Sequence, residues 1–250
     1  MSFRAASQKL FLACSRFLIV VVFVCGMTSC GIDDEPYLSP ELWVSVTSNT
    51  KAEVGGMSAS GENMYSPSYL LYYKIYISGE SESSTIQPDA MSRINGTLNS
   101  DYRGILPYTT LNTSTPQVFT PTVFSNRNFY PIVIGSTETL SASTSTITID
   151  FSNVNNALLP SLMVNGGTAQ TLNRSNGGGT FTPLPLDDRR FRNFSDLRNA
   201  QNRDVAQLSG DGDYSYCAVY IIKRGINPNT LTAIYSAPTF IAVFRLPDDY

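Results

Sequence analysis

The ten residues from Tyr69 to Ser78, YLLYYKIYIS, decide the fold of this chain. Every second residue from Tyr69 to Ile77 is aromatic or aliphatic, and Lys74 is the one charged residue of the segment. Alternation with a period of two predicts a β-strand. Because both faces of this strand are largely apolar, we expect it in the middle of a sheet. Residues 214–223, YSYCAVYIIK, have the same character and predict a second central strand.

Shorter segments on either side predict further strands. Four prolines interrupt the chain between residues 102 and 135. Since proline cannot donate a hydrogen bond to a β-ladder, that region predicts edge strands or extended segments. Two glycine clusters in residues 165–179 predict a hairpin followed by a loop. Alternating or apolar runs that predict the remaining strands are ELWVSVT at 41–47, ITIDF at 147–151, TAIYS at 232–236 and TFIAVFRL at 239–246.

The polar segments between these strands predict connections. Residues 48–68, 79–101 and 136–146 are rich in Gly, Ser, Thr or Asn, and Asn95-Gly96 predicts a tight turn. One short helix is expected over residues 196–207, where Ser195 can cap its first turn. The sequence therefore predicts an all-β fold, an antiparallel β-sandwich over residues 41–250 with long loops and one short helix.

The two central strands resemble strands C and F of fibronectin type III and immunoglobulin-like domains. The resemblance implies a sandwich in which both strands lie at the centre. The sequence departs from these families at Ser215, since their conserved tyrosine corner would place a Tyr two residues before Cys217. The two strands are also farther apart in the sequence than in those domains.

The N-terminal residues have the pattern of an export signal. Arg4, Lys9 and Arg16 precede the apolar run Phe17–Met27, which is too short for the roughly 20 residues that a transmembrane helix needs. Met27-Thr28-Ser29-Cys30 then resembles the lipobox of bacterial lipoproteins, with Met in place of the usual Leu. The resemblance implies that residues 1–29 are removed and that Cys30 carries the lipid. The alternatives are an uncleaved membrane anchor or an ordinary signal peptide cut near Cys25 or Ser29.

Residues 30–40 follow as an acidic tether, beginning CGIDDE. Acidic residues directly after the lipidated cysteine resemble the surface-export signal of Bacteroidetes lipoproteins. The tether, the YYKIYIS strand and the ending PTFIAVFRLP are together similar to uncharacterised treponemal lipoproteins. These resemblances imply an outer-membrane lipoprotein and leave open whether it faces the periplasm or the cell surface.

Composition excludes several classes of function. The chain has no histidine, so Ser-His and Cys-His pairs are impossible and zinc would lack its commonest ligand. Without residues 1–29 the chain keeps 14 Lys and Arg against 20 Asp and Glu, a net charge of −6, which argues against nucleic acid as a partner. Cys217 is then the one cysteine besides Cys30, and its apolar strand predicts a small buried hydrophobic residue.

Two further segments could carry a site. Asp211-Gly212-Asp213 and Ser215 present the alternating oxygen ligands that calcium favours, although a turn before the strand explains them equally. A second segment could bind an anionic glycan through arginine, although nearby acids predict a solvated face with weak ion pairs. Its arginines are Arg189, Arg190, Arg192, Arg198 and Arg203, and its acids are Asp187, Asp188, Asp196 and Asp204.

The sequence thus favours a non-catalytic protein that is held to the membrane through lipidated Cys30 and displays loops on a rigid sheet. Its partner would be a protein or a glycan, and no cofactor is expected. The first alternative is a structural or assembly lipoprotein that faces the periplasm. The second is an enzyme that acts on glycans through a pair of carboxylates, for which the sequence marks no candidate pair.

Overall fold

The computed structural model describes residues 42–57, 65–79, 83–102, 121–141, 143–152, 160–175, 190–191, 203–208, 213–228 and 230–247. The described residues belong to one compact unit that begins after Tyr37. Cys30 and the acidic tether lie outside the described residues, as do the segments 103–120 and 192–202.

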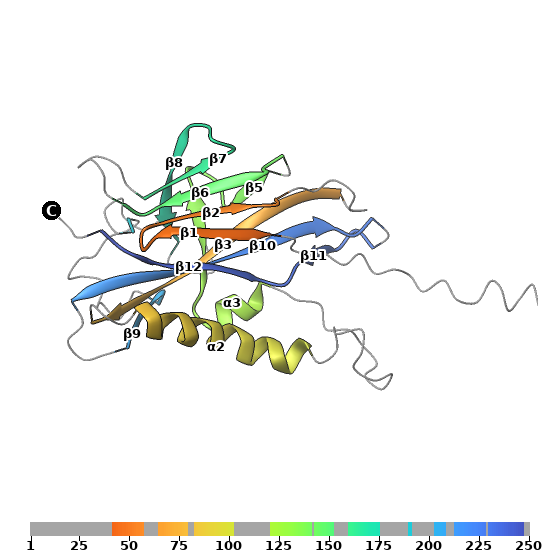
Figure 1. Cartoon of the computed structure of the whole chain (residues 1–250). Helices are drawn as coiled ribbons and strands as arrows, with labels where there is room; N and C mark the ends of the chain where they lie inside the picture. The colour runs from red at the N-terminus through yellow and green to blue at the C-terminus, as the bar shows by residue number, and fades with distance from the viewer. Residues whose placement is uncertain are drawn as a thin grey trace, which may run out of the picture. The chain divides into compact units, whose positions relative to one another are not determined.

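Most of the described chain is antiparallel β-sheet, which confirms the predicted all-β class (Figure 1). The strands form one sheet in the order β1-β2-β6-β7-β8-β4-β3-β10-β11, while β12 pairs with β10, and β5 and β9 pair with β3. Every pairing except that of β3 with β9 is antiparallel. The strands are β1 Trp43–Ser48, β2 Lys51–Gly55, β3 Tyr65–Ser78, β4 Tyr130–Ile134, β5 Thr139–Ser141, β6 Thr146–Asp150, β7 Ser161–Val164, β8 Ala169–Arg174, β9 Val205–Gln207, β10 Tyr214–Ile226, β11 Ala233–Tyr235 and β12 Thr239–Arg245.

The two strands predicted to be central do lie at the centre. β3 and β10 pair over nearly their whole length, from Tyr214 opposite Ser78 to Ile226 opposite Tyr65. Both faces of this pair are buried. Tyr69, Leu71 and the following odd-numbered residues of β3 enter one hydrophobic core, whereas Leu70, Tyr72 and Tyr76 enter a second. Both faces of the β3–β10 pair are therefore apolar because each face packs into a hydrophobic core.

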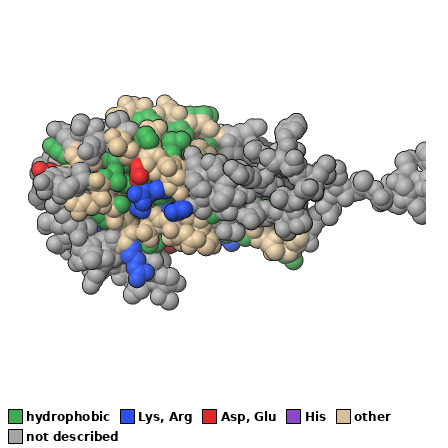
Figure 2. All heavy atoms as spheres, turned by 90° about the horizontal axis from the view of Figure 1, so that it is seen from below, with side chains coloured by type: hydrophobic (Ala, Val, Ile, Leu, Met, Phe, Trp, Pro, Cys, Tyr) green, Lys and Arg blue, Asp and Glu red, His purple; other side chains and the backbone are tan. Residues whose placement is uncertain are grey.

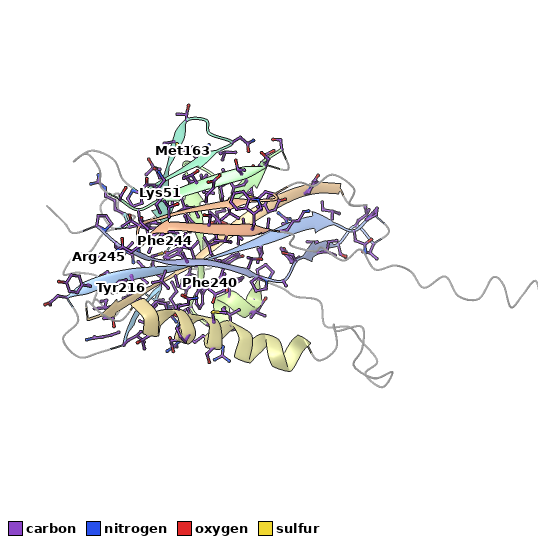
Figure 3. The ribbon with its side chains drawn as sticks, viewed as in Figure 1. Lys51, Met163, Tyr216, Phe240, Phe244 and Arg245 are labelled. Carbon is purple, nitrogen blue, oxygen red and sulfur yellow. The ribbon has the colours of Figure 1, made fainter. Side chains whose placement is uncertain are left out.

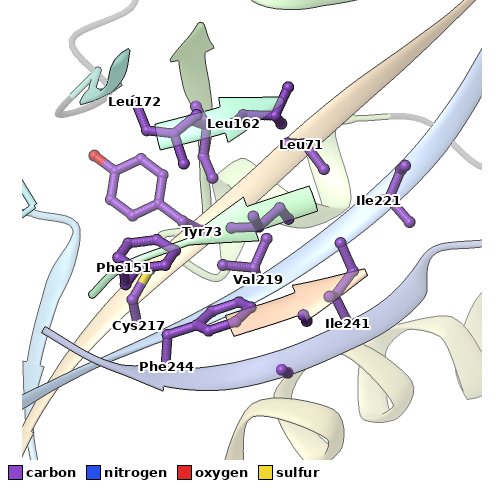
Figure 4. Packing of buried hydrophobic residues seen from close by; sticks show 14 of the residues in the cluster. Leu71, Tyr73, Phe151, Leu162, Leu172, Cys217, Val219, Ile221, Ile241 and Phe244 are labelled. Carbon is purple, nitrogen blue, oxygen red and sulfur yellow. The ribbon is translucent and has the colours of Figure 1, made fainter. Parts of the chain in front are cut away.

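The first core lies between two halves of the curled sheet (Figure 4). Leu162 and Phe151 reach it from the half that holds β6 and β7, and Val219 and Phe244 reach it from β10 and β12. The rings of Phe151 and Phe244 stack across this core with centroids 4.8 Å apart. This is the face-to-face packing expected of a sandwich, but the halves are joined, because β4 pairs with β3 at its start and with β8 at its end.

The second core lies between the sheet and two helices, α2 (Ser83–Tyr102) and α3 (Thr122–Asn126). Ile86, Ala90 and Ile94 of α2 are buried against the sheet. From α3, Phe124 stacks on Tyr72 of β3 at a centroid distance of 4.2 Å. Figure 3 shows Phe240 and Phe244 on opposite sides of β12, and the two residues belong to the second and first cores respectively.

The helix α2 corrects the prediction that residues 79–101 form a polar connection with a tight turn at Asn95-Gly96. Apolar residues recur every fourth position at Ile86, Ala90 and Ile94, which is the spacing of one helix face. Among residues 85–94, the part of α2 whose side chains are described, only these three are buried, so the periodic signal was weak among polar neighbours. The sheet supplies the apolar surface that stabilises so weakly amphipathic a helix.

Other local predictions also change. Part of the predicted helix 196–207 is described, and its residues 205–207 form β9, because they bond in parallel to the edge of β3 at Ile75–Ile77. The predicted loop 48–68 contains β2 and the start of β3, and the predicted connection 136–146 contains β5. β4, which includes Pro131, lies inside the sheet and not at an edge.

The predicted hairpin after residue 165 is confirmed as β7 and β8. Asn165 and Gly166 turn the chain with positive φ angles of 50° and 68°, which is the backbone that Asn-Gly pairs favour in two-residue turns.

Candidate functional site

The β1–β2 hairpin carries exposed large apolar side chains, Trp43 and Val46, on an edge of the described sheet. The other exposed large apolar side chains of the described surface are Met91 on α2 and Leu231 between β10 and β11. β1 ends the strand order and pairs only with β2 among the described strands. Trp43 is 48% exposed and Val46 is 55% exposed. A backbone hydrogen bond from the Arg245 amide to the Asn49 carbonyl, at 2.7 Å, joins the tip of this hairpin to the end of β12.

Trp43 has a fixed place on this hairpin. It lies opposite Gly55 in the register of β1 and β2, and a methyl group on Gly55 would overlap its indole ring. The indole therefore covers the backbone of Gly55, and half of its surface stays open to solvent. Such an aromatic residue over a glycine stabilises a strand pair and also presents a rigid apolar surface to a partner.

The exposed edge of β1 carries none of the features that usually prevent strand pairing. Its sequence, WVSVTS, contains no charged residue and no proline. Natural proteins protect long edges with lysine, proline, inward charges or a covering element. The described part of the chain places no such protection on the outer edge of β1.

A buried polar network lies where β3, β8 and the start of β9 meet. The Asp204 carboxylate accepts hydrogen bonds from Arg174 Nε and Nη2, both at 2.8 Å, and from the Tyr73 hydroxyl at 2.7 Å. Burial alone would lower the pKa of Arg174, but the charge of Asp204 and the hydrogen bonds to it raise that pKa above its ordinary value. Because both charged side chains are fully enclosed, the network fixes β8 and the turn before β9 to β3 and offers nothing to a ligand.

The structure separates the predicted arginine-rich segment into different environments. Arg203 is exposed, Arg190 is half-buried beside Asn173, and Asp204 is buried with Arg174. Arg174 was not among the residues that the sequence singled out, because nothing near it in the sequence distinguishes it. The remaining residues of that predicted set lie outside the described residues; they are Arg189, Arg192, Arg198, Asp187, Asp188 and Asp196.

The predicted calcium ligands are only partly described. Asp213 is exposed, while Ser215 is buried as the second residue of β10, and Asp211 and Gly212 lie outside the described residues. In the ranges that the structure covers, no three acidic or cysteine side chains form a group that could hold a metal ion.

Cys217 is a fully buried free cysteine, which confirms its predicted role as a small hydrophobic residue. Burial raises the pKa of its thiol well above the ordinary value. The thiolate that a nucleophile requires is therefore disfavoured at this position.

The layer under α2 contains a buried lysine. Lys74 Nζ donates a hydrogen bond to the Arg127 carbonyl at 2.8 Å and lies 5.5 Å from the centre of the Phe129 ring. Burial, together with repulsion from Arg93, lowers the pKa of Lys74 to about 8. Figure 2 shows the lower face of the molecule, where, among the described residues, charged side chains are few. Lys74 is almost inaccessible, so we interpret it as a structural group.

Comparisons with protein-family models, with curated proteins and with solved structures find no match for this chain. Among the described residues, neither helix is long and apolar enough to cross a membrane.

Proposed function

We propose that this chain is a lipid-anchored, non-catalytic envelope protein that acts by binding, with the β1–β2 hairpin as its contact surface. The observation that carries this proposal is the exposed, unprotected edge of β1 with Trp43 and Val46. Large exposed apolar side chains on a rigid element are typical of interaction sites.

The proposed lipid anchor would place the β1–β2 hairpin close to the membrane. Cys30 lies 13 residues before Trp43, and an extended chain of that length spans at most about 45 Å. β1 is the first described strand after this tether. Lipidation at Cys30 would hold the hairpin near the membrane, where two acyl chains give stable anchoring.

The proposal places binding on a strand edge where the sequence favoured loops. The segments 48–68 and 79–101 were predicted as loops for display, but they contribute β2, the start of β3 and α2. The non-catalytic part of the proposal is supported by the absence of histidine and by the enclosure of the Arg174–Asp204 pair.

Fractionation of cells that produce the full chain tests the anchored part of the proposal. We expect the wild type and a Cys217→Ala variant in the membrane fraction, and Cys30→Ala in the soluble fraction. Wild type in the soluble fraction, or Cys30→Ala retained in the membrane, would contradict it.

Protease treatment of intact cells then decides the face of the membrane. Digestion of the intact-cell protein supports a surface-exposed binding protein with a protein or glycan partner. Protection until the outer membrane is broken supports the alternative, a structural or assembly lipoprotein that faces the periplasm.

A further inference from the structure

We propose that β1 pairs with β1 of a second copy of this chain, in antiparallel orientation, so that two sheets become one. The inference names the partner of the contact surface in the proposed function. It does not depend on lipidation of Cys30, although anchoring would favour it.

The first support is that β1 is a six-residue edge strand that pairs only with β2 among the described strands. β5, β9 and β11 are each three residues long, and β12 contacts both α2 and the β1–β2 hairpin. Six residues of β1 offer backbone donors and acceptors to a partner strand. Unpaired edges of this kind are templates for strand addition.

The second support is the symmetry of the strand itself. Val44 and Val46 flank Ser45, so an antiparallel pair centred on Ser45 places Val44 of each copy opposite Val46 of the other. Ser45 then lies opposite its own equivalent. Cross-strand pairs of β-branched residues stabilise sheets, and the pairing would cover Val46, which is 55% exposed in the single chain.

The third support is electrostatic. β1 carries no charge, so self-pairing brings no like charges into contact. The nearest carboxylate on the same hairpin is Glu53, opposite Ser45 on β2. In the paired sheet the two Glu53 residues would be three strand spacings apart, about 14 Å. This separation is longer than the Debye length at physiological ionic strength, so salt largely screens the repulsion between the two carboxylates.

The geometry also suits two anchored chains. An antiparallel pair has a twofold axis, and each subunit contributes the same surface to the contact. When that axis stands along the membrane normal, both tethers begin at the same height. Two chains confined to one membrane also meet at a raised effective concentration.

Disulfide crosslinking in cells that produce the full chain tests this inference, with Ser45→Cys as the probe and Glu53→Cys as the matched control. Disulfide formation needs Cα atoms within about 7 Å, which the proposed pairing provides at position 45 and denies at position 53. Cys217 is buried, so it adds no background.

After mild oxidation we expect a reducible dimer from Ser45→Cys and no dimer from Glu53→Cys. A digest of the Ser45→Cys dimer should contain two copies of the peptide that spans position 45, joined by a disulfide. Adding Val46→Pro to Ser45→Cys removes a backbone donor from the strand and should abolish the dimer. The emission of Trp43, the one tryptophan of the chain, reports whether each purified variant keeps the folded hairpin.

Three outcomes would overturn the inference: a monomeric Ser45→Cys with native Trp43 emission, equal crosslinking at both positions, or crosslinking of position 45 to a different protein only. The same experiment in a Cys30→Ala background separates the two proposals. A dimer there, at raised protein concentration, keeps the self-pairing even if the anchor proposal fails.

Discussion

The Tyr73 hydroxyl donates a 2.7 Å hydrogen bond to the Asp204 carboxylate, although the two residues lie 131 positions apart in the chain. Tyr73 also accepts a hydrogen bond from the Ser175 amide at 3.2 Å. Together with Arg174, these contacts tie the end of β8 and the start of β9 to the central strand β3. We therefore expect this network to contribute strongly to the stability of the region where β3, β8 and β9 meet.

Asp204→Ala should destabilise the fold strongly. The substitution leaves the Arg174 guanidinium buried without its counter-charge, and breaking a buried pair in this way costs about 3–5 kcal/mol. Urea unfolding of the purified protein measures the loss. Lys51→Ala is the control, because its pair with Asp150 at 3.5 Å is partly exposed and is worth below about 1 kcal/mol. Equal losses from the two variants would contradict this account.

Two tyrosines of β3 and β10 should respond oppositely to removal of their hydroxyls. The Tyr220 hydroxyl is buried and has no hydrogen-bond partner among the described residues, so Tyr220→Phe should be neutral or should stabilise the fold. Tyr73→Phe removes a bonded hydroxyl and should cost on the order of 1–3 kcal/mol. Thermal unfolding of the two variants, which lose the same atom, gives the comparison; a larger loss from Tyr220→Phe would count against the structure.

Lys74 should make stability depend on pH. Its folded-state pKa of about 8 lies below the ordinary value of 10.5, so between these values the unfolded chain binds more protons. The free energy of unfolding should therefore rise with pH, by at most about 2 kcal/mol between pH 7.5 and 9.5. The measurement is urea unfolding across this range for the wild type and for Lys74→Met.

The difference in pH dependence between the wild type and Lys74→Met reports the contribution of Lys74, because the buried tyrosines, which also titrate at high pH, are present in both proteins. We expect the slope with pH to be smaller in Lys74→Met. An unchanged slope would show that Lys74 keeps its ordinary pKa in the folded protein.

Gly55→Ala should displace the indole of Trp43. The new methyl group would occupy the space that the ring now fills, and the exposed ring can swing into solvent. The emission of Trp43 should shift to longer wavelength, with a stability loss below about 1 kcal/mol from the broken cross-strand pair. Glu53→Ala, on the same strand, serves as the control and should leave the emission unchanged; a shift in the control alone would contradict the placement of Trp43.

Sequence patterns predicted the parts of this fold in which local alternation is strong. Tyr69–Ser78 and Tyr214–Lys223 are apolar on both faces because cores lie on both sides of the β3–β10 pair. The alternation of Ile147 and Ile149 likewise predicted β6. The helix α2 escaped prediction because only three of its residues 85–94, whose side chains are described, are buried. The sheet below them supplies most of its stabilisation.

The contacts between distant segments could not be predicted. Val205–Gln207 forms a strand because the edge of β3 is available to it, which no local signal reports. Arg174 and Asp204 are 30 positions apart, and the sequence grouped Asp204 with nearby arginines. The exposed edge of β1 follows from the strand order, whereas the sequence revealed only its alternation.

The proposed function requires that Cys30 attaches this chain to a membrane. Metabolic labelling with an alkyne analogue of palmitate tests it most directly, using the wild type, Cys30→Ala and Cys217→Ala. The account predicts label on the wild type and on Cys217→Ala, and none on Cys30→Ala. An unlabelled wild type, or equal label on Cys30→Ala, would contradict it.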